Sequence, residues 1–133
     1  MMTWTHLSAV AVGGAVGSVG RYWLSHQVNM WMGLGGFPWG TLSVNVIGSF
    51  LIGFLMILLQ ESLQADAHWR LLLVVGMLGG FTTFSSFSWD TYALWVQGKY
   101  VIASMNVLAS LMTCLLGTGL GVWLARVAYT NTQ

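Results

Sequence analysis

The feature that most constrains this chain is its near lack of charge. Its 133 residues include four basic and three acidic side chains, so that 5% of the residues are charged, whereas soluble domains average about 25%. Hydrophobic residues make up 56% of the chain. A water-soluble protein with so few charges would leave much apolar surface facing water, whereas in a bilayer that surface faces lipid. The chain is therefore predicted to be an integral membrane protein.

Four stretches are long and apolar enough to cross a bilayer, which takes about 20 residues per helix. They cover residues 4–24, 39–59, 71–95 and 101–127. Glycine, proline or charged residues separate them. We therefore expect residues 1–133 to form a single all-α domain with four transmembrane helices, in a multi-pass protein of the cell membrane (inner or plasma membrane).

The basic residues give no preferred orientation. Arg21 and Lys99 fall on one side of the predicted membrane, and Arg70 and Arg126 on the other, so the Lys/Arg bias that normally sets topology is zero. Either another factor selects one orientation, or the chain inserts both ways and two copies pair head to tail. A bundle of this size has little room for a pore, and a two-fold dimer is the default assembly that would supply one.

The sequence lacks the residues that several classes of function require. The basic side chains are scattered, which excludes a nucleic-acid interface. Cys114 is the only cysteine, so it has no partner for an intrachain disulfide. His6, His26 and His68 lack partners at metal-ligand spacing. No pairing of a nucleophile with a base points to an enzyme.

The first two spans carry a few polar groups at informative places. Thr41, Asn45 and Ser49 lie four residues apart and so share one face of the second helix. They either form interhelical hydrogen bonds or, in the case of Asn45, offer uncharged N–H donors to an anion inside the span. Arg21 either extends to the interface or lines a watery mouth that attracts anions. Gly13 and Gly17 form a GxxxG pair, which predicts close helix packing.

The third span contains the strongest signal, the run Gly79-Gly80-Phe81-Thr82-Thr83-Phe84-Ser85-Ser86-Phe87-Ser88. Two glycines followed by hydroxyl residues disfavour a continuous helix. We therefore predict a break near the midplane, where freed carbonyl groups are available to a cation. Phe84 and Phe87 share a face; they either pack or present their electropositive edges to an anion.

The fourth span carries a weaker polar stripe. Asn106, Ser110 and Cys114 recur every four residues. Gly117 and Gly121 form a second pair of small residues, which predicts another close helix contact.

These motifs resemble those of the Fluc fluoride channels over nearly the whole chain. Three segments, one in each of the first three spans, carry the resemblance. They are Gly13-Gly14-x-x-Gly17-x-x-x-Arg21-Tyr22, Gly40-Thr41-Leu42-x-Val44-Asn45-x-x-Gly48 and the run from Gly79 to Ser88. The chain differs from the family in having Ser86 where threonine is common, and in lacking a tyrosine between Val101 and Val122, where Asn106 occupies the corresponding position.

The resemblance implies an antiparallel, dual-topology homodimer with two pores that exports fluoride from the cytoplasm. It implies a structural sodium ion (Na+) at the dimer centre, held by the backbone carbonyls of Gly79 and Thr82. Asp90 corresponds to a polar position near the pathway. The residues that the resemblance and the polar stripes together place on the fluoride pathway are Arg21, Thr41, Asn45, Phe84, Ser85, Ser86, Phe87, Ser88, Asn106 and Ser110.

Two other functions are compatible with a small four-helix membrane protein. A proton-coupled exporter of cations needs a carboxylate within the membrane, and only Asp90 lies near a span. A non-conducting assembly subunit would explain the glycine pairs, but not Asn45 together with the hydroxyl-rich third span. Both therefore rank below an anion channel.

Overall fold

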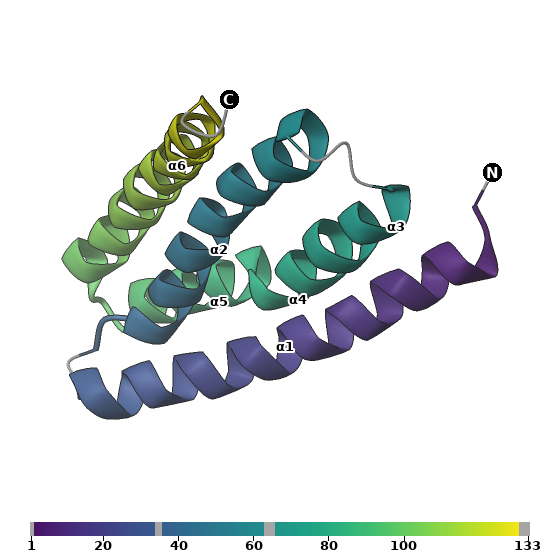
Figure 1. The fold of residues 1–133 in the computed structure, drawn as a ribbon. Helices are drawn as coiled ribbons and strands as arrows, with labels where there is room; N and C mark the ends of the chain where they lie inside the picture. The colour runs from purple at the N-terminus through teal and green to yellow at the C-terminus, as the bar shows by residue number, and fades with distance from the viewer. Residues whose placement is uncertain (1, 34–35, 63–65, 131–133) are drawn as a thin grey trace.

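The computed structural model describes residues 2–33, 36–62 and 66–130, and most of these residues are helical. Four helical segments follow one another, as expected, and the third is divided into short pieces (Figure 1). The elements in chain order are α1 (Trp4–Met32), α2 (Trp39–Ile57), η1 (Leu58–Ser62), α3 (Ala67–Arg70), η2 (Leu71–Leu78), α4 (Gly79–Phe81), α5 (Phe84–Val96) and α6 (Tyr100–Thr130).

Three segments of the described chain are long and apolar enough to cross a membrane. They are Trp39–Glu61, Ala67–Val96 and Tyr100–Thr130, and they coincide with the second, third and fourth predicted spans. With 29 residues, α1 is long enough to be a fourth, but its composition is more polar than that of the other three. By length and composition, the structure therefore supports three spans directly.

Close backbone contact joins α1 to the third segment. A Cβ atom on Gly17 would collide with the carbonyl oxygen of Met77, and one on Gly13 would collide with that of Leu72. Both carbonyl groups belong to η2, which Figure 1 shows above the middle of α1. The predicted close packing at the GxxxG pair is confirmed, and its partner is a π-helical stretch that the sequence pattern did not indicate.

A second close contact joins α2 to α6, which pack along each other (Figure 1). A Cβ atom on Gly121 would collide with the carbonyl oxygen of Phe50, and one on Gly53 would collide with that of Thr118. A Cβ atom on Gly117 would lie 3.4 Å from the nearest backbone oxygen, which is a tolerable distance. Of the predicted pair in the last helix, Gly121 therefore makes the closer approach.

Most apolar side chains point away from the bundle. Val44 and Asn106 are the largest side chains that are fully buried. Large apolar side chains with more than half of their surface exposed include Val16, Val19, Leu108, Leu111, Leu115 and Leu120. Such a surface suits a chain surrounded by lipid or by another copy of itself.

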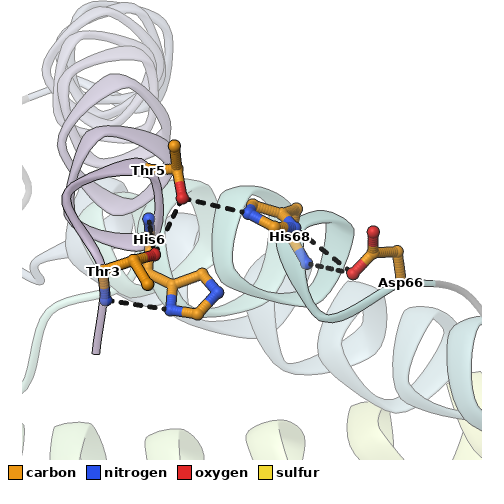
Figure 2. A network of polar contacts seen from close by, with 5 residues as sticks. All are labelled: Thr3, Thr5, His6, Asp66 and His68. Carbon is orange, nitrogen blue, oxygen red and sulfur yellow. Dashed lines mark hydrogen bonds and ion pairs between the residues drawn. The ribbon is translucent and has the colours of Figure 1, made fainter. Parts of the chain in front are cut away.

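A polar network ties the start of α1 to α3 at one end of the molecule (Figure 2). The Nε2 atom of His68 lies 3.3 Å from the hydroxyl of Thr5, and the rings of His6 and His68 are 4.8 Å apart. Hydrogen bonds from the side chain and backbone of His68 hold the pKa of Asp66 below its usual value. The network fixes how α1 begins relative to the third segment.

Basic side chains lie at both ends of the bundle. Arg126 contacts Glu61 at the end where α2 meets the third segment, with an N–O distance of 3.4 Å. Lys99 lies at the other end, where its Nζ atom would be 3.6 Å from a Cβ on Gly36. Arg126 and Lys99, which the sequence predicted on opposite sides of the membrane, thus lie at opposite ends of the bundle.

Candidate functional site

The third segment is interrupted where the sequence predicted a break. Helix α4 ends at Phe81, Thr82 and Thr83 have extended backbones, and α5 begins at Phe84. The break lies near the middle of the apolar stretch Ala67–Val96. A break there leaves backbone groups without helical partners, and these need other partners where water is absent.

Asn45 supplies one such partner from α2. Its Nδ2 atom donates to the Thr83 carbonyl at 2.9 Å, and its Oδ1 atom accepts from the Thr83 N–H at 2.7 Å. Gly48, one turn later, leaves room for the Thr82 methyl group, which a Cβ there would strike. The second and third sequence motifs thus meet at the break. In the second motif, Asn45 supplies hydrogen-bond partners to the backbone of the break, and Gly48 leaves space for its side chain.

Two backbone carbonyls at the break are released from helical hydrogen bonding. In a continuous helix the Thr83 N–H would donate to the Gly79 carbonyl, but here it donates to Asn45. The Ser86 N–H would donate to the Thr82 carbonyl, but here it donates to the Thr83 hydroxyl at 3.1 Å. The released oxygens are the two predicted to hold sodium, and carbonyl oxygens of this kind suit a hard cation.

Hydroxyl groups cluster around the start of α5. The Thr83 side chain caps the helix by accepting from the Ser86 N–H, and its hydroxyl donates to Ser86 Oγ at 3.1 Å. Ser85 Oγ lies 3.2 Å from the same hydroxyl. Thr83 was not among the predicted pathway residues, although a threonine immediately before a helix is a recognisable N-cap signal.

An open cavity of about 600 Å³ lies between α2, the break and α6. Asn45, Phe84, Phe87 and Ser110 line it, and none of the described residues in its lining is charged. The rings of Phe84 and Phe87 are 5.3 Å apart and tilted by 48°, and Phe84 is 76% exposed. The structure therefore brings together four of the predicted pathway residues.

Arg21 lines a second cavity, of about 240 Å³, with Thr41, Thr83 and Ser86. Arg21 is half-buried, and no hydrogen bond or ion pair of its guanidinium is found among the described residues. A guanidinium has five N–H donors and no acceptor, so this cavity is suited to an anion.

Thr41 also borders a third cavity, of about 380 Å³, whose lining includes Asp90 and Lys99. The Thr41 hydroxyl donates to Asp90 Oδ2 at 2.6 Å. Asp90, which the sequence placed near the pathway, thus links α5 to α2 through this hydrogen bond.

The structure places three predicted pathway residues, Ser85, Ser88 and Asn106, outside the lining of these cavities. Asn106 is 1% exposed and donates through Nδ2 to the Thr91 hydroxyl at 2.9 Å, and that hydroxyl donates to the Phe87 carbonyl at 2.8 Å. Ser88 is exposed and lines none of the three cavities. Asn106 is thus connected to Phe87 by two hydrogen bonds through Thr91, a residue that the sequence pattern did not indicate.

Comparisons with known proteins agree with this geometry. Residues 8–122 match the family model for CrcB-like protein, Camphor Resistance (CrcB). A fluoride-specific ion channel of Geobacter sulfurreducens is 50% identical over 92% of this chain and 98% of its own length. Proteins of the same description from Agrobacterium fabrum and Magnetococcus marinus are 48% and 46% identical, over 91% and 89% of this chain and 96% and 95% of their own lengths. The chain therefore belongs to the CrcB-like (Fluc) family.

Proposed function

We propose that this protein is a fluoride-selective ion channel that exports fluoride across the cell membrane and so lowers cytoplasmic fluoride. The observation that carries the proposal is the uncharged cavity in which the Asn45 amide, the Phe84 and Phe87 rings and Ser110 come together at the helix break. The family is one of fluoride channels rather than enzymes. The apolar helices make it a multi-pass membrane protein.

The lining suits an ion that must bind and then leave. Fluoride is small and strongly hydrated, so entering a pore requires other groups to replace its water. Amide and hydroxyl donors and the positive edges of aromatic rings can share that task. A fixed positive charge at the same place would hold the ion too tightly for fast conduction.

The working unit in this proposal is an antiparallel homodimer with two pores and four transmembrane helices in each copy. The tight packing of α1 through Gly13 and Gly17 supports its inclusion as the fourth span. The exposed Phe84 side chain and the open cavity beside it leave a surface that a second copy would complete. The balanced basic residues allow one sequence to supply both orientations.

A sodium ion held by the carbonyls of Gly79 and Thr82 is the structural cofactor in this proposal. These two carbonyl oxygens are available to a cation because their helical donors bond to other groups. The Thr83 N–H donates to Asn45, and the Ser86 N–H donates to the Thr83 hydroxyl. The bound ion would serve as a partner for the two carbonyl oxygens that have lost their helical donors. Prolonged removal of sodium should lower both the thermal stability of the purified dimer and its fluoride flux. If neither quantity changes, the proposal that sodium is a structural cofactor is wrong.

The main test is fluoride efflux from liposomes that contain the purified protein, with chloride efflux measured in parallel. We expect fast fluoride release with little chloride release. Phe84→Ile and Phe87→Ile keep apolar bulk but remove the aromatic edge, so each should reduce the fluoride rate by at least about tenfold, equivalent to about 1.4 kcal/mol.

Phe54→Ile is the matched control, because Phe54 lies on α2 and lines none of the three described cavities. Its flux should equal that of the unmodified protein. Unchanged flux in both Phe84→Ile and Phe87→Ile would remove the aromatic rings from the pathway. Folded, dimeric protein that releases no fluoride would contradict the channel function.

A further inference from the structure

Lys99 stands at the mouth of the 380 Å³ cavity at one end of the bundle. It follows Gly98, whose φ of 75° turns the chain from α5 into α6. Among the described residues, no carboxylate lies within ion-pair distance of its ammonium group. The charge of Lys99 is therefore not neutralised by direct contact with an acidic side chain in this part of the chain.

Shared lining residues place the three cavities in an order. Thr41 lines both the cavity at Lys99 and the cavity at Arg21. Thr83 lines both the cavity at Arg21 and the uncharged cavity with Phe84. An anion that followed this order would meet Lys99 first and Arg21 second, and then a site without charge.

We propose that Lys99 is an electrostatic positioning residue that concentrates fluoride at one mouth of its pathway. This inference rests on the proposed channel function. A cation at the mouth of a cavity with low-dielectric walls raises the local concentration of anions, and the effect falls as salt screens the charge. Because Lys99 is exposed at the rim, it can attract fluoride without holding it inside the pore.

The negative charge of Asp90 is the reason why a cation is needed at this mouth. Among the described residues that line the same cavity, it is the one acidic residue, and its carboxylate accepts a hydrogen bond from Thr41 at 2.6 Å. A carboxylate at this place repels fluoride. With Lys99 the charges of the lining balance, whereas without Lys99 this mouth would carry a net negative charge.

The test is the dependence of fluoride efflux on ionic strength for Lys99→Gln and Lys99→Arg. At about 0.01 M salt, where the Debye length is about 30 Å, Lys99→Gln should lower the initial rate about two- to fivefold. At about 1 M salt, where the Debye length is about 3 Å, its rate should equal that of the unmodified protein. Lys99→Arg should behave as the unmodified protein at both salt concentrations.

Arg70→Gln is the matched control, because it removes one exposed positive charge at the other end of the bundle and away from the three described cavities. Its rate should change little at either salt concentration. A Lys99→Gln rate equal to the unmodified rate at low salt, or reduced equally at low and high salt, would overturn the role of Lys99 while leaving the channel function in place. Absence of fluoride flux in the unmodified protein would overturn both.

Discussion

At the scale of single residues, Asn45 has the most consequential position. One amide satisfies both the N–H and the carbonyl of Thr83, 38 residues further along the chain. By taking up that N–H, it also releases the Gly79 carbonyl from the helix. The same side chain thus stabilises the break and exposes an oxygen that a cation can use, while it lines the cavity in which we place fluoride.

Asn45→Leu should destabilise the protein more than an ordinary membrane hydrogen bond would suggest. Such bonds contribute about 0.6 kcal/mol on average, whereas two buried backbone groups left without partners cost about 2 to 6 kcal/mol together. Unfolding of the purified protein in detergent, followed against denaturant, measures the difference.

Asn106→Leu serves as the comparison, because it removes an amide that bonds to a side-chain hydroxyl rather than to the backbone. Its cost should be about 1 kcal/mol. Equal losses of stability in the two variants would mean that the Thr83 backbone finds other partners when Asn45 is replaced.

At the scale of elements, the third segment is shaped by what packs against it. Gly13 and Gly17 let α1 approach the backbone of η2, and Gly48 lets α2 approach the break. The Thr83 hydroxyl then starts α5 as its N-cap. The interrupted helix is therefore held on two sides by close contacts that only glycine permits.

Gly17→Ala should separate α1 from η2, because the added methyl group would overlap the Met77 carbonyl oxygen. Overpacking of this kind costs about 1 to 3 kcal/mol, which outweighs the gain in helix propensity of about 1 kcal/mol. A lower unfolding temperature and a lower fluoride flux are expected.

Gly14→Ala tests whether the effect comes from close packing. A Cβ there would lie 3.9 Å from the Gly76 carbonyl oxygen, which is ordinary contact. This variant should be as stable as the unmodified protein, or more stable. If both variants lose stability alike, the contact between α1 and η2 is not the cause.

At the scale of the whole molecule, the surface is largely apolar, and the sequence predicts two basic residues on each side of the membrane. The first property makes the chain a membrane protein. The second leaves its orientation without a Lys/Arg bias, which is the basis for the antiparallel dimer proposed above.

Labelling of one end in intact cells should reveal both orientations. With Cys114 replaced by serine and Thr130→Cys introduced at the exposed end of α6, a membrane-impermeant maleimide should modify about half of the chains, because no charge bias selects one orientation. Labelling of nearly all chains or of none would establish a single orientation and exclude the antiparallel pair. Permeabilised cells, in which all chains should react, provide the control.

The sequence by itself determined the properties that depend on local composition. The lack of charge and the length of the apolar stretches determined a helical membrane protein, and the glycine and hydroxyl run determined where the third helix would break. Only the tertiary structure decided the partners of the polar groups. Examples are the Thr83 backbone for Asn45, the Thr91 hydroxyl for Asn106 and the π-helical backbone of η2 for the α1 glycines. The physical reason is that composition and periodicity act along one segment, whereas these partners belong to other segments and are set by how the helices cross and how closely their backbones approach.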